Sequence, residues 1–450
     1  MDARLIARVL ASRRRLLRRD GWDRSRLEAH QAQALHALRE YAASRSSFYQ
    51  RYHRGLAGKP LSELPVLTKG MLMDSFDRLV TDPRVRLHAL EAHLAERVGE
   101  PFLGRYRVNA TSGTTGRRGV FLFDAREWAF VLASYARAYA WAGVMPGPTR
   151  RVPTAVVSTT KPWHQSAAVG ASVQSRFMPT LRLDATAPLE ALTERLNAFQ
   201  PEALIAYAST LRLLADAQLA GALAIAPRAV LSASEALTPE TRRLIGRAWG
   251  LEPFDVYAAT ETATIAAECE HRRPHLFEDL VIAEVVDEAG RPVPVGEHGA
   301  KVLVTVLFGR TLPLIRYEMS DSVSLAAGSC PCGRPYALLA GIMGRREEVL
   351  RLRAARGGWV EVHPNVFHDV IDLLPTGGWQ VSLGPEGLAV LLVGAGGVDD
   401  ARLVAALEVA LAGRGAAPLP VTVRRVAEIP KTAVGKAPLV TSQPLERQPS

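Results

Sequence analysis

The chain has 450 residues, of which 48% are apolar and 22% charged, and its formal net charge is +10. This length exceeds what one ordinary hydrophobic core organises, so we expect two domains. No apolar run approaches the roughly 18 residues of a membrane span, and the N-terminus lacks the apolar centre of a secretory signal. Three cysteines are too few for a disulfide framework and predict a reducing, cytoplasmic location.

The positive charge does not by itself indicate a nucleic-acid partner. Much of the excess lies in the first twenty residues, which have the pattern of a basic amphipathic helix, and the rest is scattered arginine. A single-strand platform would need aromatic side chains interleaved with the cations, and no such pattern recurs. We therefore expect neither nucleic acid nor membrane as a partner. The sequence leaves the oligomeric state, a homodimer included, open.

Helical periodicity dominates residues 1–55, and a proline-bounded stretch follows at 60–65. Between about 105 and 340, short β-rich runs alternate with helical segments. The predicted strands are 120–123, 154–158, 203–208, 229–233 and 254–258, and the clearest predicted helices are 187–199 and 239–249. This alternation predicts an α/β fold with a mainly parallel sheet that helices cover on both faces. Residues 280–308 predict antiparallel strands instead.

The composition changes after Gly344. A charged stretch ends in paired glycine at 357–358, and a predicted helix at 399–412 lies between strand-like runs. We expect three parts in all. An N-terminal helical segment (1–60) packs on a large domain (61–344), and a small α/β domain (345–450) follows.

The most informative stretch is VNATSGTTGRRGV at 108–120, between two strand-like runs. Glycine lets the backbone approach a ligand closely, and successive backbone amides together with serine and threonine hydroxyls form a cradle for anions. Taken alone, such a stretch is often an ordinary turn. The lysine and helix start of a Walker loop are absent, so this predicts a different kind of phosphate loop.

Five further segments follow the loop in a fixed order: SASEAL (232–237), YAATE (257–261), RYEMSD (316–321), GRREEVLRLR (344–353) and PKTAVGK (430–436). With the loop, this series resembles the adenylate-forming superfamily of acyl-CoA ligases, peptide-synthetase adenylation domains and luciferases. The nearest branch is that of phenylacetate-CoA ligases and coenzyme F390 synthetase-like proteins. The resemblance covers residues 60–436. It implies that a carboxylic acid reacts with ATP to give an acyl-adenylate and pyrophosphate. It also implies that the large domain (61–344) binds ATP and the acid, and that the small domain (345–450) is a mobile lid.

The resemblance also implies a role for each matching residue. The loop that ends at Gly119 would hold the β- and γ-phosphates of ATP, with Thr111, Ser112, Gly113, Thr114, Thr115 and Gly116. Ala233, Ser234 and Glu235 would line the adenine, and Tyr257 would stack on it. Thr260 would reach the α-phosphate, and Glu261 would bind Mg²⁺. Asp321 would accept hydrogen bonds from both ribose hydroxyls, with Arg345 beside it.

The resemblance assigns Lys436 and Glu347 to the small domain that moves during the reaction. By the resemblance, Lys436 would bridge the carboxylate and the α-phosphate and stabilise charge in the transition state, and Glu347 would lie at the hinge of the small domain. The chemistry itself requires such a cation, because a carboxylate that attacks a phosphate meets charge repulsion. A lysine near the C-terminus can be brought in by domain closure and then withdrawn.

The chain departs from the family pattern at three places. Arg117 and Arg118 stand where the phosphate loop usually has a lysine. Met319 and Ser320 precede Asp321 in place of the usual Thr-Gly. The hinge segment is Arg345-Arg346-Glu347 in place of Arg-x-Asp, a change that bears on the hinge more than on the ATP site.

The three cysteines form a second group of candidate residues. Cys269 lies in ECEHRRPH, and Cys330 and Cys332 lie in SCPCG. Three thiolates and an imidazole suit a tetrahedral zinc site. Of the two nearby histidines, His275 matches the similar segments of phenylacetate-CoA ligase-like proteins better than His271. We expect a structural zinc ion with no catalytic role, against the alternative of reduced cysteines that only pack.

Few residues in the sequence indicate which acid is bound. PWHQS at 162–166 and Tyr207 each follow a predicted strand, where ligands of open α/β sheets bind, so His164 and Tyr207 are candidate contacts to the acid. We expect an aryl or similarly compact acid and transfer of its acyl group to coenzyme A. The alternatives are transfer of AMP itself, as in F390 synthetase-like relatives, and transfer of the acyl group to an amine or a carrier protein. A non-catalytic nucleotide-binding protein is a further alternative, against which Lys436, Glu261 and Asp321 count.

Overall fold

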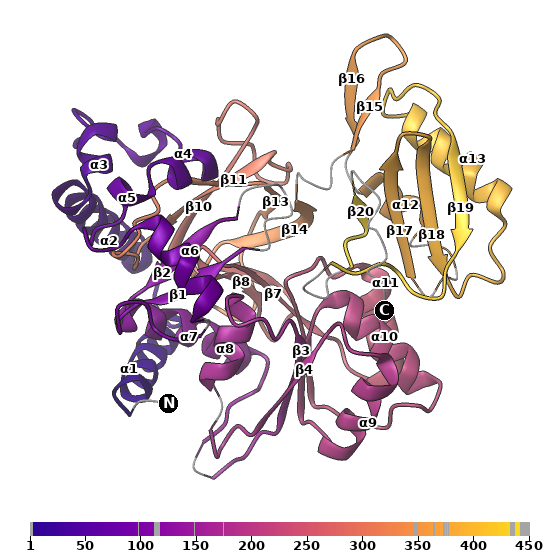
Figure 1. Ribbon diagram of the computed structural model, residues 1–450, viewed down its shortest axis with the longest axis horizontal. Coiled ribbons are helices and arrows are strands. Elements are labelled where there is room, and N and C mark those ends of the chain that lie inside the picture. The colour runs from indigo at the N-terminus through magenta and orange to yellow at the C-terminus, as the bar shows by residue number, and fades with distance from the viewer. Residues whose placement is uncertain are drawn as a thin grey trace.

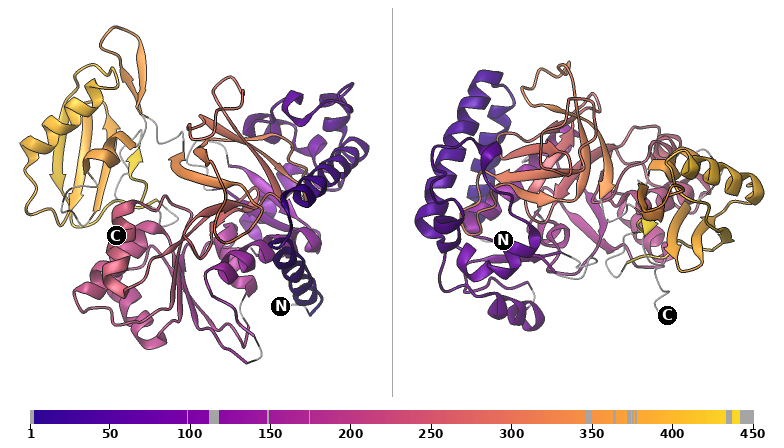
Figure 2. Two further views of the ribbon diagram at one scale, coloured as in Figure 1. Left: turned by 180° about the vertical axis from the view of Figure 1, so that it is seen from behind. Right: turned by 90° about the horizontal axis from the view of Figure 1, so that it is seen from above.

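The computed structural model describes residues 3–97, 99–111, 118–147, 149–173, 175–345, 350–362, 365–371, 374, 376, 378–432 and 437–441. Figure 1 and Figure 2 show the first helices on one side of the molecule, the main sheet in the middle and the C-terminal strands on the opposite side. Among the described helices, none combines the length and apolar character that crossing a bilayer requires.

Helices form the N-terminal part, as expected for residues 1–55. They are α1 (Ala3–Arg19), α2 (Arg24–Arg45) and α3 (Ser47–Tyr52), followed by a 3₁₀ turn (Leu61–Glu63), α4 (Lys69–Asp74), α5 (Phe76–Leu79) and α6 (Leu87–Glu96). α1 packs along α7 (Ala125–Trp141). A buried ion network supports this packing, because Arg19 of α1 and Arg137 of α7 both bond to the fully buried Asp279, at 3.2 and 2.8 Å.

Nine strands form the main sheet in the order β13-β14-β9-β8-β7-β6-β5-β3-β4. Their bounds are β3 (Thr154–Ser158), β4 (Thr180–Asp184), β5 (Ala203–Ala206), β6 (Ala229–Ala233), β7 (Phe254–Ala259), β8 (Ala263–Glu268), β9 (Pro274–Leu276), β13 (Asp321–Ala326) and β14 (Leu338–Arg345). β4, β3, β5, β6 and β7 are parallel, and the pairs from β7 to β13 are antiparallel. The helices that connect the parallel strands are α8 (Gln165–Val173), α9 (Leu189–Phe199), α10 (Ala208–Leu219) and α11 (Pro239–Trp249).

Strand β5 shows why the parallel strands are apolar throughout instead of alternating. Leu204 and Ala206 pack into the core formed with α9, α10 and α11, whereas Ala203 and Ile205 pack into the core formed with α7 and α8. A strand covered on both faces needs apolar residues at every position. The predicted mainly parallel α/β sheet is thus confirmed. The predicted strand 203–208 is too long by two residues, because Tyr207 caps α10.

Two smaller sheets lie beside the main one. β1 (Arg107–Ala110) and β2 (Val120–Phe123) form an antiparallel hairpin around the glycine-rich loop. β10 (Val281–Val286), β11 (Lys301–Val306) and β12 (Tyr317–Met319) form a three-stranded antiparallel sheet. The antiparallel strands predicted for residues 280–308 are therefore confirmed.

The C-terminal part has a hydrophobic core of its own. Its elements are β15 (Leu350–Arg353), β16 (Trp359–Val362), α12 (Asn365–Ile371), β17 (Gly378–Gly384), β18 (Gly387–Val393), α13 (Asp400–Ala412), β19 (Val421–Arg425) and β20 (Val440–Thr441). Four strands form a sheet in the order β19-β18-β17-β20, and β15 and β16 form a separate hairpin. A separate core agrees with a small C-terminal domain, whose boundary at residue 345 stays a prediction.

Candidate functional site

The ends of β6 and β7 bring the candidate adenine-binding residues together. The two strands are parallel, with Ala233 opposite Val256, so Tyr257 lies beside Ala233 at one edge of the sheet. Ser234 follows with a φ of 70°, which is uncommon for a residue with a side chain and marks the turn as a candidate functional position. The carboxyl ends of parallel strands are where open α/β sheets bind ligands.

Thr111 and Gly119 close the glycine-rich loop at its base. The Thr111 N–H donates to the Gly119 carbonyl and the Gly119 N–H donates to Thr111 Oγ1, both at 2.9 Å. A Cβ atom on Gly119 would lie 3.0 Å from Phe121 Cε2 and 3.3 Å from Lys69 Cε, so a ring and a lysine stem fill the space beside this glycine. The loop residues 112–117, with Ser112, Gly113, Thr114, Thr115 and Gly116, lie outside the described residues.

Three cations gather beside the base of the loop. The side chain of Lys69 of α4 lies beside Gly119, and both Arg118 and Lys161 lie over the ring of Trp163, with Cζ and Nζ at 5.0 and 5.9 Å from its centre. The Trp163 carbonyl accepts the N–H of Ala110 at 2.8 Å, which ties this segment to β1. Converging cations of this kind favour a polyanionic ligand such as a triphosphate. Lys69 was not among the site residues predicted from the sequence.

A glutamine holds the turn between β7 and β8. Gln165 Nε2 donates to the carbonyl of Thr260 at 3.1 Å, and Gln165 Oε1 accepts the hydroxyl hydrogen of Tyr135 at 3.0 Å. Gln165 is the first residue of α8 and is buried. The segment PWHQS thereby supports the turn that carries Thr260 and Glu261, a role that the sequence analysis did not assign.

His164 and Tyr207 lie at the predicted edge of the sheet, and both are buried, at 8% and 2% exposed. The N–H of Thr159, just past the end of β3, donates to the Tyr207 hydroxyl at 3.0 Å. Burial raises the pKa of Tyr207 to about 12, so its hydroxyl stays protonated at neutral pH. Tyr207 is therefore a neutral, hydrogen-bonded wall of this edge.

Asp321 and Arg345 are direct cross-strand partners in the pair β13–β14. Asp321 is buried, at 7% exposed. The role of Asp321 and Arg345 in binding the ribose stays a prediction. β8, β9 and β14 separate Asp321 from Tyr257 in the sheet order, so no strand pairing brings these two residues together. Glu347 and Lys436 lie outside the described residues.

The carboxylate of Glu235 joins the main sheet to the C-terminal segment. Its Oε2 accepts the N–H of Ser209 in the first turn of α10 at 2.9 Å, and its Oε1 accepts the N–H of Ala437 at 3.1 Å. On the other side of the same segment, Lys431 Nζ lies 3.4 Å from the carbonyl oxygen of Ala185, which follows β4. The described residues on both sides of position 436 thus contact the main-sheet part of the chain.

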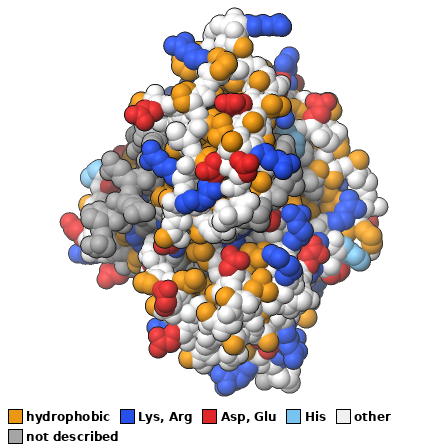
Figure 3. All heavy atoms as spheres, turned by 90° about the vertical axis from the view of Figure 1, so that its right-hand side faces the viewer, with side chains coloured by type: hydrophobic (Ala, Val, Ile, Leu, Met, Phe, Trp, Pro, Cys, Tyr) orange, Lys and Arg blue, Asp and Glu red, His pale blue; other side chains and the backbone are white. Residues whose placement is uncertain are grey.

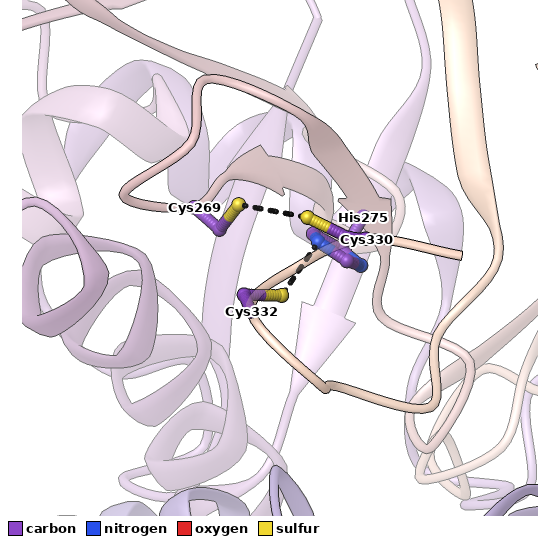
Figure 4. A group of neighbouring side chains, drawn as sticks. All are labelled: Cys269, His275, Cys330 and Cys332. Carbon is purple, nitrogen blue, oxygen red and sulfur yellow. Dashed lines mark hydrogen bonds between the residues drawn. The ribbon is translucent and has the colours of Figure 1, made fainter.

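Four candidate metal ligands converge at a second place, in the antiparallel half of the sheet (Figure 4). The ligand atoms of Cys269, His275, Cys330 and Cys332 all lie within 4.8 Å of one another. The two sulfurs of Cys269 and Cys330 are 3.6 Å apart, and the sulfur of Cys332 is 3.2 Å from His275 Nε2. His271 is exposed and does not belong to the group, which agrees with the preference for His275.

The surroundings of this cluster fit a zinc ion. His275 Nδ1 lies 3.2 Å from the carbonyl oxygen of Tyr336, so the tautomer that donates there leaves Nε2 available for a metal. Burial lowers the pKa of His275 to about 4, which keeps the ring neutral. None of the three cysteines forms a disulfide. Three sulfurs and one nitrogen are the kind of ligand set that closed structural zinc sites use, and such a site would leave no open position for catalysis.

Sequence comparisons relate the chain to phenylacetate-CoA ligases, although no family model matches it. It is 26% identical over 376 residues to the phenylacetate-coenzyme A ligase of Thermus thermophilus, which covers 78% of this chain and 76% of that protein. It is 28% identical over 277 residues to the phenylacetate-coenzyme A ligase of Escherichia coli, which covers 59% of this chain and 60% of that protein.

The fold is similar to that of solved acyl-CoA ligases. One is 2-hydroxyisobutyryl-CoA ligase in the postadenylation state in complex with 2-HIB-AMP, with a TM-score of 0.69 and 19% identity, covering 91% of this chain and 88% of that one. The same ligase in complex with 2-HIB-AMP and CoA in the thioesterification state has a TM-score of 0.59 and 21% identity, covering 95% of this chain and 91% of that one.

The fold class is therefore that of adenylate-forming ligases. Together, the sequence relatives and the shared fold support the adenylate-forming superfamily and, within it, the branch of phenylacetate-CoA ligases.

Proposed function

We propose that the protein joins a carboxylic acid to ATP as an acyl-adenylate, with release of pyrophosphate, and then transfers the acyl group to coenzyme A. One observation carries the proposal. Glu235, two residues after the end of β6, accepts the N–H of Ala437, the neighbour of Lys436. The candidate catalytic lysine is thus next in sequence to a residue bonded at the edge where the candidate adenine-binding residues meet.

The cations near this edge of the sheet would offset the negative charge that the reaction brings together. In the first step a carboxylate oxygen attacks the α-phosphorus, and the bond from that phosphorus to the bridging oxygen of pyrophosphate breaks. Lys436 would offset the repulsion between the attacking carboxylate and the α-phosphate. Lys69, Arg118 and Lys161 would stabilise the charge of the departing pyrophosphate. In the second step the CoA thiolate attacks the acyl carbonyl carbon, and AMP leaves.

Two metal ions belong to the proposal. Glu261, in the turn that Gln165 supports, would hold Mg²⁺, which when bound neutralises phosphate charge. The cluster of Cys269, His275, Cys330 and Cys332 would hold a structural zinc ion that links β8 and β9 to the loop between β13 and β14. Free thiols in such a site suit a reducing compartment such as the cytoplasm.

The substrate we propose is an aryl or similarly compact acid. His164 and Tyr207 are its candidate contacts at the sheet edge. The buried tyrosine hydroxyl is already bonded to Thr159, and this neutral wall favours a small apolar group over a charged one.

The test is pyrophosphate release from MgATP across a panel of aryl and short carboxylic acids, with and without CoA. We expect release that depends on one class of acid, collapses in Lys436→Ala and leads to a thioester when CoA is present. Lys59→Ala is the matched control, because Lys59 is exposed and pairs with Glu63. ATP binding without pyrophosphate release across the panel would contradict the proposal. Release with AMP or the acyl group found on another acceptor would contradict its second step.

A further inference from the structure

Trp163 lies under two of the cations that gather beside the glycine-rich loop. Arg118 Cζ lies 5.0 Å from the centre of its ring and Lys161 Nζ lies 5.9 Å from it, which are cation–π distances. Arg118 precedes β2, whereas Lys161 and Trp163 follow β3, so these contacts join two segments that are distant in sequence. One tryptophan ring thus links a cation at the base of the loop to a cation at the edge of the main sheet.

The tryptophan ring is held in place by its surroundings. Trp163 is half-buried and packs against the core formed with α7 and α8. Its carbonyl accepts the N–H of Ala110 at 2.8 Å, and the N–H of His164 donates to the carbonyl of Lys161 at 3.0 Å, which closes the turn that contains Trp163. Both bonds use the backbone, so they do not depend on the tryptophan side chain. A ring fixed in this way orients a cation before a ligand arrives, which lowers the entropic cost of binding.

The guanidinium of Arg118 has a donor available for a ligand. Among the described residues, its Nη2 is buried and has no hydrogen-bond partner. A buried donor without a partner costs free energy, so an anion bound at this position would remove that cost. A guanidinium that lies over a ring also keeps its N–H groups available, because they point outward in its own plane. Arg118 directly precedes Gly119, which closes the base of the loop that we expect to hold the β- and γ-phosphates.

The tryptophan also suits the arginine that this chain has at the end of the loop. Arg117 and Arg118 stand where the family pattern has a lysine. The ammonium of a lysine is a compact point charge, whereas a guanidinium is planar, stacks on aromatic rings and binds phosphate through two N–H groups. Because a ring beside Arg118 fixes the plane of its guanidinium, Trp163 gives an arginine at this position the orientation that phosphate binding requires.

We propose that Trp163 is a positioning residue whose ring holds Arg118 and Lys161 toward the β- and γ-phosphates of ATP. The inference rests on the proposed function, which places the triphosphate at this loop. Trp163 itself touches neither ATP nor the acid and acts only through the two cations. Its contribution should therefore disappear when both cations are removed, and it should concern only ligands that carry the β- and γ-phosphates.

The test measures the dissociation constants of MgATP, magnesium pyrophosphate and AMP by calorimetry on the full chain. We expect Trp163→Leu to weaken MgATP and pyrophosphate by about threefold to tenfold and to leave AMP unchanged. Trp163→Phe keeps an aromatic ring and should restore most of the affinity. In a protein that carries Arg118→Met and Lys161→Met, the further change Trp163→Leu should have no effect, because residues that act through one another are not additive.

Trp359→Leu is the matched control for the tryptophan. Trp359 also has two arginines at its ring, with Cζ of Arg353 and Arg351 at 4.2 and 5.4 Å from its centre. It is 54% exposed and belongs to the C-terminal part, which is on the right in Figure 1 and faces the viewer in Figure 3. Its replacement removes the same kind of contact elsewhere, so MgATP should bind as it does to the unmodified protein.

Four results would overturn the inference. They are unchanged MgATP affinity in Trp163→Leu, an equal loss of affinity for AMP, an equal effect of Trp163→Leu with and without the two cations, and no MgATP binding by the unmodified protein. Acid-dependent pyrophosphate release is measured on the same preparations. Because the binding measurements need no acid, a protein that binds MgATP through Trp163 but releases no pyrophosphate would contradict the proposed function and leave the inference standing.

Discussion

Glu235 accepts two backbone N–H groups from distant parts of the chain, that of Ser209 at 2.9 Å and that of Ala437 at 3.1 Å. Hydrogen bonds to a carboxylate are stronger than those to a neutral acceptor. One side chain thus joins the start of α10 to the residue that follows Lys436. The assignment of Glu235 to the adenine stays a prediction, and these contacts make its carboxylate a candidate for positioning the C-terminal segment as well.

Glu235→Gln tests this positioning role. An amide has one acceptor oxygen, so one of the two N–H groups loses its partner. Because a hydrogen bond to a charged group contributes about 1.5–3 kcal/mol, we expect acid-dependent pyrophosphate release to slow by roughly tenfold or more. Single-turnover pyrophosphate release is the measurement. The effect should fall on this rate more than on the KM for ATP.

Glu194→Gln is the matched control for Glu235, because Glu194 is an exposed residue of α9. It should react at the rate of the unmodified protein. A Glu235→Gln protein that releases pyrophosphate at the normal rate would show that the bond to Ala437 does not position the catalytic segment.

Lys69→Met tests the electrostatics of the phosphate loop. Methionine keeps most of the apolar stem that fills the space beside Gly119 and removes the charge. We expect the KM for ATP to rise several-fold. The difference in KM between the variant and the unmodified protein should shrink at high salt, because salt screens interactions of exposed charges. Lys59→Met, on the surface, should keep the normal KM. An unchanged KM in Lys69→Met would separate this lysine from phosphate binding.

The sequence predicted the parallel sheet well because the signal is local. The strands 154–158 and 229–233 and the helix 239–249 match β3, β6 and α11, since each apolar run lies between clear turn residues. The hairpin of β15 and β16 was missed, because arginine alternates with leucine there and the stretch resembles a charged surface segment. The pairing of β20 with β17 joins residues distant in sequence, for which local patterns hold no information.

Some features of the candidate site could also be predicted from the sequence, and others could not. The adjacency of Ala233 and Tyr257 follows from strand order, and the cysteine cluster followed from residue type together with a resemblance. The places of Lys69 and Gln165 could not be predicted, because their partners Gly119 and Thr260 come from segments far along the chain. Such contacts are set by packing, which no local pattern encodes.

Chemical analysis of the cysteine cluster tests the zinc proposal. We expect the purified protein to contain about one zinc ion per chain, as a site with four protein ligands requires. Cys330→Ser should lose the zinc and lower the melting temperature, since the ion would join β8 and β9 to the loop between β13 and β14. Elemental analysis and thermal unfolding, each with and without a chelator, are the measurements.

His271→Ala is the control for the zinc site, because His271 is exposed and lies outside the cluster. It should keep both the zinc content and the melting temperature. If the unmodified protein, purified without chelator, contains no zinc and its melting temperature does not depend on added zinc, the alternative that the cysteines only pack would be favoured.

Asp255 of β7 makes the stability of the fold depend on pH. Burial raises the pKa of Asp255 to about 7, repulsion from Glu268 adds to this rise, and Arg242 opposes it. Arg242 is bonded to Glu268 at 2.7 Å, so the guanidinium compensates that carboxylate most directly. In the unfolded chain an aspartate has a pKa of about 3.9. The folded protein therefore binds one more proton than the unfolded chain between about pH 4 and 7.

The sign of the effect follows from this difference. The free energy of unfolding falls as the pH rises from about 4 to 7, and above 7 Asp255 causes no further change. Asparagine resembles the protonated carboxyl in shape and keeps an oxygen for the Val256 N–H, which lies 3.0 Å from Asp255 Oδ1. We expect Asp255→Asn to raise the melting temperature at pH 8 and to change it little at pH 5.

Asp287→Asn is the control, because the pKa of Asp287 is lowered by its hydrogen bond from the Arg291 N–H and its carboxyl is ionised at both pH values. If Asp255→Asn shifted the melting temperature equally at both pH values, Asp255 would not titrate in this range.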